Sequence, residues 1–214
     1  TDIAIVALNS LIFFGLGYSI LIENDGGKDY CGFFTLAIAA VHAVAGRVIY
    51  KQKETSASLV NLAAGMALLF AAWAVPIQWD GNVVTLVWAG AAVLLFWTGR
   101  TRSWPFYEAV AYVFMVLASL SLLDDWTRYY WEDGRANDFR TLLNIRFLSS
   151  VLFLAAFGYI FLLNKNSRYP SEWAVKNGIR SIVSYTLPAV LLFVLYSAFF
   201  QEISDYWDQL DRSS

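Results

Sequence analysis

Long apolar runs alternate with short polar segments along the whole chain. A helix needs roughly 20 mostly apolar residues to cross the hydrocarbon layer of a bilayer. The links between the runs are mostly short, which favours antiparallel neighbours that follow one another in sequence. The pattern therefore predicts an all-α fold, a polytopic bundle of seven transmembrane helices. The predicted spans are residues 3–22, 31–50, 59–77, 83–98, 105–123, 142–163 and 179–200.

The polar stretch QWDGN, residues 78–82, separates the third and fourth apolar runs. Asp-Gly and Gly-Asn pairs favour turns, because glycine accepts positive φ and Asp or Asn side chains bond their own backbone. Pro76 helps to end the preceding helix, since it has no backbone N–H to donate. Trp79 suits the headgroup layer, where an indole can keep its ring in lipid and its N–H in water. The stretch predicts a tight, water-exposed hairpin.

The composition of the chain indicates that a lipid bilayer, rather than water, surrounds most of it. Hydrophobic residues make up 58% of the chain and charged residues 15%, against about 25% charge in soluble domains. The net charge of −2 gives no indication of nucleic-acid binding. The single cysteine, Cys31, cannot form an internal disulfide. The first span starts at residue 3 without a basic leader, so we expect the chain to be a piece of a longer polytopic protein.

Seven spans place alternate links on opposite faces, and the Lys and Arg residues are divided unequally between these faces. The basic-rich face is cytoplasmic by the positive-inside rule, which gives an N-in, C-out topology in a bacterial inner membrane. The other face carries most of the acids. The face of the N-terminus holds Arg47, Lys51, Lys53, Arg100, Arg102, Lys165, Arg168, Lys176 and Arg180, and the opposite face holds Lys28, Arg128, Arg135, Arg140 and Arg212.

Two segments near the acidic face lie outside the spans. We take residues 1–200 as the seven-helix transmembrane domain and residues 201–214 as an acidic amphipathic tail, which either continues the seventh helix or lies on the membrane surface. The link 124–140 is acidic and aromatic. Enrichment of Trp and Tyr at interfaces favours an interfacial helix or belt, and binding of a sugar or a cation is the alternative.

Polar residues inside the spans are functional candidates, because an intramembrane charge costs at least a few kcal/mol. Glu108 follows Pro105 near the inner end of the fifth span, where free helix N–H groups would stabilise its carboxylate; a proton carrier is the alternative. His42, the only histidine, has no metal-binding motif around it, so we expect it to bond across helices. Asn61 belongs to the same intramembrane set. No metal or cofactor is expected.

A second group of candidates belongs toward the acidic outer face. An ion pair between Arg146 and Asp80 would neutralise the arginine where water is scarce. The alternatives are that Arg146 snorkels to headgroups or caps carbonyls of the hairpin, or that the group forms an outer pocket for an anion. Glu108 and Arg146 lie at opposite membrane ends and should not pair. The candidate ligand-binding residues are Asp80, Trp79, Trp88, Asn144 and Arg146.

Three stretches carry a family resemblance: AVPIQWDGNVVTLVWAGAAVLLFWTGR, LLNIRFLSSVLFLAAFGY and ALNSLIFFGLGY. Together with most of the chain they resemble a large bacterial family of membrane proteins known as domain of unknown function 2339. The family's members are much longer, with more spans. The family pattern has an acid shortly after the tryptophan that matches Trp88, whereas Ala89, Gly90, Ala91 and Ala92 follow it here. The resemblance implies a polytopic membrane protein and no particular activity.

The function expected from these residues is a membrane scaffold or interaction module of a larger envelope protein. Its partners would be the lipid bilayer and envelope components or partner membrane subunits. The alternative is a transporter or channel with an outer vestibule around Arg146 and Asp80, with Pro188 as a flexing point. An enzyme ranks last, because candidate acid–base groups are sparse.

Overall fold

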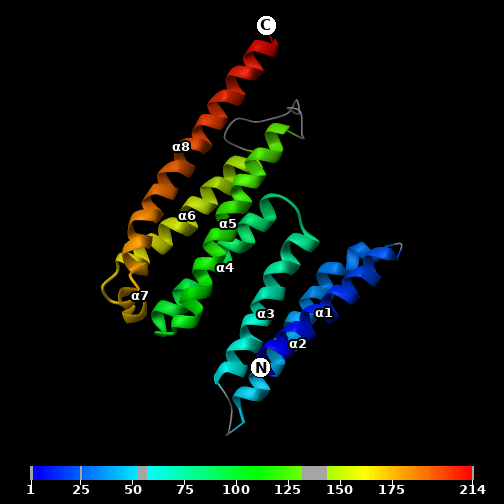
Figure 1. The fold of residues 1–214 in the computed structure, drawn as a ribbon. Helices are drawn as coiled ribbons and strands as arrows, with labels where there is room; N and C mark the ends of the chain where they lie inside the picture. The colour runs from blue at the N-terminus through cyan, green and yellow to red at the C-terminus, as the bar shows by residue number, and fades with distance from the viewer. Residues whose placement is uncertain (1, 25, 53–56, 132–143, 214) are drawn as a thin grey trace. The chain divides into compact units, whose positions relative to one another are not determined.

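The computed structural model describes residues 2–24, 26–52, 57–131 and 144–213. Within these ranges it is all-helical, and seven helices are long and apolar enough to cross a membrane. This confirms the predicted all-helical fold and its seven long apolar helices. The seven are α1 (Asp2–Glu23), α2 (Cys31–Tyr50), α3 (Ala57–Gln78), α4 (Asn82–Thr101), α5 (Pro105–Trp131), α6 (Ile145–Lys165) and α8 (Ile179–Ser213), and two short elements join them, η1 (Gly27–Tyr30) and α7 (Glu172–Lys176) (Figure 1).

The helices form two compact units, Thr1–Asp80 and Gly81–Ser214. In the first unit α2 packs lengthwise against α3, and α1 adds contacts to both. The core centres on Phe70, which is fully buried, and the partly buried Phe14 of α1 packs against it. A Cβ on Gly46 would lie 3.2 Å from Ala63 Cβ, so small residues let α2 and α3 approach closely.

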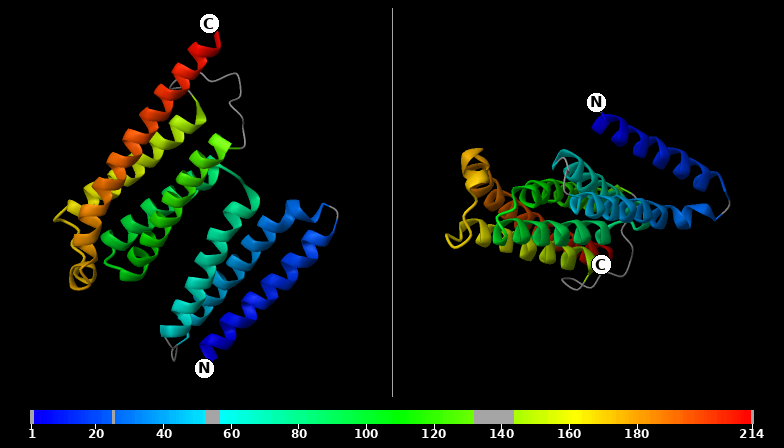
Figure 2. Two further views of the ribbon diagram at one scale, coloured as in Figure 1. Left: turned by 45° about the horizontal axis from the view of Figure 1, so that its top comes forward. Right: turned by 90° about the horizontal axis from the view of Figure 1, so that it is seen from below.

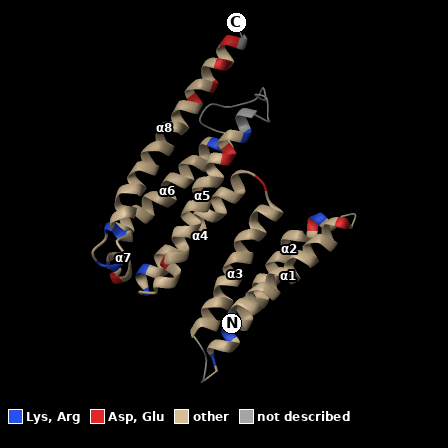
Figure 3. Ribbon diagram, viewed as in Figure 1, with Lys and Arg blue, Asp and Glu red and all other residues tan. Residues whose placement is uncertain are grey.

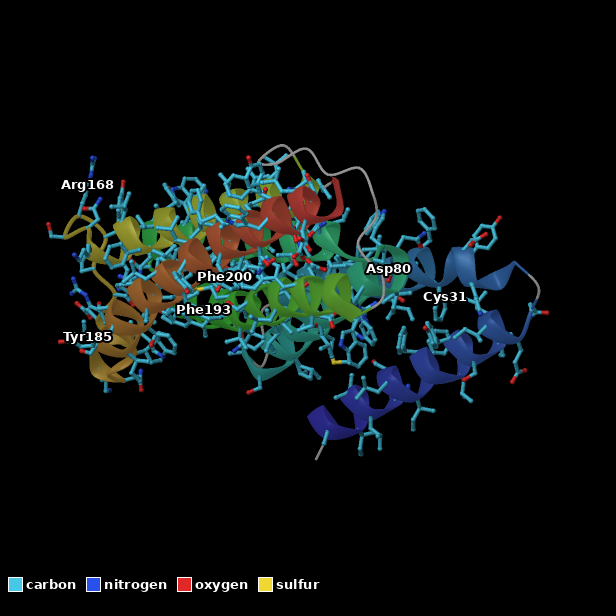
Figure 4. The ribbon with its side chains drawn as sticks, turned by 90° about the horizontal axis from the view of Figure 1, so that it is seen from above. Cys31, Asp80, Arg168, Tyr185, Phe193 and Phe200 are labelled. Atoms are coloured by element: carbon cyan, nitrogen blue, oxygen red, sulfur yellow. The ribbon has the colours of Figure 1, made fainter. Side chains whose placement is uncertain are left out.

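In the second unit α4 packs against α5 and α6, and α8 lies along α6 (Figure 2). Aromatic side chains form much of its core. Phe96, Phe153 and Phe157 are at most 1% exposed, and the last two stack with ring centroids 3.9 Å apart. Large apolar side chains cover the outside as well; Tyr185, Phe193 and Phe200 on α8 are 81%, 53% and 55% exposed (Figure 4). This unit contains both candidate sites described below.

The predicted break between the third and fourth apolar runs is present. α3 ends at Gln78, α4 begins at Asn82, and Gly81 adopts a positive φ of 64°. Trp79 and Asp80 are exposed, as a water-facing turn requires. Pro76 lies inside the last turn of α3, two residues before the helix ends.

Two helices extend well beyond their apolar runs. α8 continues without a break to Ser213, so the tail from residue 201 is part of the seventh helix rather than a separate surface helix. α5 continues to Trp131, which makes the first part of the link 124–140 helical; its remainder, from residue 132, lies outside the described residues. α6 starts at Ile145, later than the predicted 142, where the Asn144 side chain caps it by accepting a hydrogen bond from Phe147 N at 2.7 Å.

Candidate functional sites

The described charged residues of the second unit gather at helix ends (Figure 3). Acids mark the last turns of α8, whereas basic residues mark the connection from α6 to α7. At each end, however, one arginine turns inward and is buried: Arg100 at the end of α4 and Arg146 at the start of α6. Each arginine organises a network of polar side chains that joins several helices.

The Arg100 network is built on a buried ion pair. Arg100 Nε lies 2.9 Å from Glu108 Oε1, and the two side chains are 0% and 2% exposed. A short turn brings them together, because Ser103 adopts a positive φ of 53° between α4 and α5. Gly99 makes the close approach possible, since a Cβ there would lie 2.7 Å from Glu108 N.

Other helix ends complete the coordination of this pair. Arg100 Nη2 donates to Asn164 Oδ1 at 2.5 Å, and Nη1 donates to the Tyr169 carbonyl at 3.3 Å. The Glu108 carboxylate accepts hydrogen bonds from Tyr112 Oη at 2.8 Å and from Ser171 Oγ at 2.6 Å. Side chains from α4, α5 and the start of α7 thus stabilise the carboxylate, and the expected contribution of helix N–H groups stays a prediction. The network ties α4, α5, α6 and α7 together at one end of the unit.

A hollow of about 430 Å³ borders this network. It lies between the turn from α4 to α5 and the start of α7. Glu108 and Ser171 form part of its wall, so the buried pair lies directly behind it. We call it the α7 hollow; its lining is Gly99, Ser103, Pro105, Glu108, Pro170, Ser171, Glu172 and Trp173.

The Arg146 network lies at the opposite end of the helices. Arg146 Nη2 forms an ion pair with Asp205 Oδ2 and lies 3.9 Å from Glu202 Oε1. Asn144 Nδ2 donates to the same Glu202 oxygen at 2.6 Å. Both acids belong to α8, so the network joins the start of α6 to the last turns of α8. Ser149 Oγ extends it toward α4 by donating to Asn82 Oδ1 at 3.1 Å.

Only two residues of the predicted outer group are brought together. Arg146 and Asn144 do come together in one buried network. Asp80 and Trp79 belong to the first unit, so the expected ion pair of Arg146 with Asp80 stays a prediction. Trp88 is half-buried in α4. Glu108 and Arg146 are each paired with another residue, consistent with their expected separation.

His42 bonds across helices, as predicted. Its Nε2 lies 3.0 Å from Ser10 Oγ on α1, and its Nδ1 lies 2.9 Å from the Ile38 carbonyl one turn earlier on α2. The ring also packs against Phe70, with centroids 5.5 Å apart. Asn61 is exposed on the surface of α3. Within the described ranges, no group of His, Cys, Asp and Glu side chains has the arrangement of a metal site.

Several residues of the two networks were not among the sequence candidates. In the sequence analysis Arg100 served only as one of the basic residues that set the orientation. Glu202 and Asp205 served only as members of the acidic outer face. The sequence did carry one signal: opposite charges eight positions apart flank a short turn between two spans. The residues found only in the structure are Arg100, Tyr112, Asn164, Ser171, Glu202 and Asp205.

Comparison of the chain with models of protein families, with curated proteins and with solved structures finds no match. The geometry of the networks and of the α7 hollow therefore carries the functional argument.

Proposed function

We propose that the chain is a multi-pass protein of a bacterial inner membrane, oriented N-in and C-out, and that it acts as a membrane scaffold or interaction module of a larger envelope protein. Seven helices of sufficient length and apolarity support insertion into a bilayer. The excess of Lys and Arg on one face supports the orientation. Similarity to the domain of unknown function 2339 is part of the same proposal.

The observation that carries this proposal is the internal pairing of the buried arginines. A transporter uses intramembrane charges to meet its substrate or coupling ion, and such groups line a polar cavity near the bilayer midplane. Arg100 and Arg146 instead contact Glu108 and Asp205 from neighbouring helices. Side chains committed to one another hold helix ends together, which is what a scaffold requires.

The exterior of the helices supports an interaction role as well. Tyr196 on α8 is 69% exposed, and Leu192 one turn earlier is 66% exposed. Such side chains meet either lipid or the helices of partner membrane subunits. The alternative is a transporter with a vestibule around Arg146 and Asp80. In that case Arg146 would have to break its contacts with Asp205 and Glu202 during each transport cycle in order to bind a substrate.

Cysteine labelling tests the topology. In a Cys31→Ser background, Asp80→Cys should react with a membrane-impermeant maleimide in intact cells whose outer membrane has been permeabilised. Lys51→Cys should react only after the cells are lysed. The opposite pattern, or equal labelling of both, would contradict the orientation.

Photo-cross-linking tests the scaffold role. A photoreactive amino acid at the exposed Tyr196 should give a protein adduct of defined mass in living cells, and its partner can be identified by mass spectrometry. The same group at Leu187, which is 3% exposed on α8, is the matched control and should give only internal cross-links. Adducts of Tyr196 with lipid alone would contradict an interface at this part of α8.

A further inference from the structure

The α7 hollow has the size of a ligand site rather than of a packing defect. Its volume of about 430 Å³ falls in the range of roughly 300–1,000 Å³ that small-molecule pockets occupy. One wall contains Glu108, which is held by its buried ion pair with Arg100. The other wall is the start of α7, which contributes Glu172 and Trp173.

The Arg100 network fixes the second wall against the first. Ser171 Oγ donates to Glu108 Oε2 at 2.6 Å and accepts a hydrogen bond from Ala174 N at 3.1 Å, so it both anchors and caps α7. Glu172 and Trp173 lie between these two bonded residues. Their backbone is therefore held at the hollow by the same interactions that bury Glu108.

The charges of the hollow select for a cation. The two charged side chains of its described lining, Glu108 and Glu172, are both acids. Arg100 neutralises Glu108 from behind, whereas Glu172 is exposed and has no ion pair with any described residue. An exposed carboxylate that forms no ion pair, in the lining of a hollow, attracts a positive group. Trp173, which is half-buried beside it, offers an aromatic face for a cation–π contact.

We propose that the α7 hollow binds a primary ammonium group, supplied either by the ethanolamine headgroup of a phospholipid or by a free amine. A primary ammonium donates three hydrogen bonds, and the hollow presents the carboxylate of Glu172 and the hydroxyl of Ser103 as acceptors. A choline group carries the same charge without N–H donors, so it satisfies the charge and leaves the acceptors unused. The lipid source rests on the proposed membrane insertion, whereas binding of a free amine does not.

Competition between two lipids tests the proposal. The full chain, purified in detergent, is mixed with equal amounts of phosphatidylethanolamine and phosphatidylcholine, and the retained lipid is measured by native mass spectrometry. Free ethanolamine is titrated separately by calorimetry. Preferential retention of phosphatidylethanolamine identifies the lipid as the source, and binding of ethanolamine without that preference identifies a free amine.

Variants of the hollow locate the binding. Glu172→Gln keeps the size of the side chain and should weaken ammonium binding about three- to fivefold, the effect of one partly exposed ion pair. Trp173→Leu should weaken it about twofold through loss of the cation–π contact. Glu23→Gln alters an exposed acid of the other unit and should leave binding unchanged.

Two results would overturn the proposal. One is equal retention of both lipids by the wild-type chain together with no heat from ethanolamine. The other is binding that Glu172→Gln leaves at the wild-type level. Neither result bears on the scaffold role, which the labelling and cross-linking experiments test at Lys51, Asp80 and Tyr196.

Discussion

Arg100 and Glu108 form an ion pair at 2.9 Å in a place where neither side chain reaches the surface. They lie at facing ends of consecutive helices, so the pair closes the hairpin of α4 and α5. Hydrogen bonds from Tyr112 and Ser171 to the two carboxylate oxygens add to this pairing. Buried charges are tolerated only when they are paired and hydrogen-bonded in this way.

Removing one member of this pair should be strongly destabilising. Arg100→Ala leaves the Glu108 carboxylate buried without its counter-charge, which costs about 3–5 kcal/mol in buried pairs. The unfolding free energy can be measured by titrating the detergent-solubilised chain with sodium dodecyl sulfate. The double variant Arg100→Met, Glu108→Gln removes both charges and should recover part of the loss.

An exposed ion pair provides the control for this experiment. Arg128 Nε and Asp124 Oδ2 lie 2.8 Å apart, and both side chains are 56% exposed. Asp124→Asn should change the unfolding free energy by no more than about 1 kcal/mol, because water screens the pair. If Asp124→Asn and Arg100→Ala lowered the unfolding free energy equally, burial of the Arg100–Glu108 pair would not increase the cost of breaking it.

Gly99 should not tolerate a side chain. A Cβ at this position would lie 2.7 Å from Glu108 N and 3.0 Å from Glu108 Cα. Because those atoms are backbone, α4 and α5 would have to move apart, and overpacking of this kind costs about 1–3 kcal/mol. The measurement is the unfolding free energy of Gly99→Ala in the same detergent titration.

Gly158 in α6 offers a matched comparison for that substitution. A Cβ there would meet nothing within 4 Å. Gly158→Ala should therefore be neutral or stabilising by up to about 1 kcal/mol, since alanine favours a helix interior. If both glycine variants had the same stability, close helix approach at Gly99 would not matter.

The sequence predicted the helices well because hydropathy reports directly on them. It did not predict that α5 continues to Trp131, and it left open whether the seventh helix continues through the tail, as α8 does to Ser213. A hydropathy window detects the apolar length of a helix and not its hydrogen-bonded length.

The networks were harder to predict, for a different reason. Ser171 lies 63 positions from Glu108, and Glu202 lies 58 positions from Asn144. Such contacts depend on how the helices pack, and no local pattern encodes them. Arg100 and Glu108 are the exception, because a short turn brings opposite charges together and their pairing can be inferred from spacing.

The contacts of Arg146 should hold the last turns of α8 against α6. Arg146→Ala removes the partner of Asp205 and the neighbour of Glu202, both on α8. Backbone amides from residue 201 onward should then exchange hydrogen faster, because local opening of this part of α8 costs less. Amides in the middle of α5 serve as the internal reference and should keep their wild-type rates. Unchanged exchange throughout α8 would mean that other contacts hold it in place.

The hydrogen bond between His42 and Ser10 should stabilise the first unit by a modest amount. Hydrogen bonds between membrane helices contribute about 0.6 kcal/mol on average and at most about 1.7, so Ser10→Ala should lower the unfolding free energy by about that much. His42→Ala should cost more, because it also removes the ring contact with Phe70. Ser19→Ala is the matched control, since Ser19 Oγ donates within α1 to the Gly15 carbonyl and joins no second helix. If Ser19→Ala were as destabilising as Ser10→Ala, the contact between α1 and α2 through His42 would contribute no more than a bond within one helix.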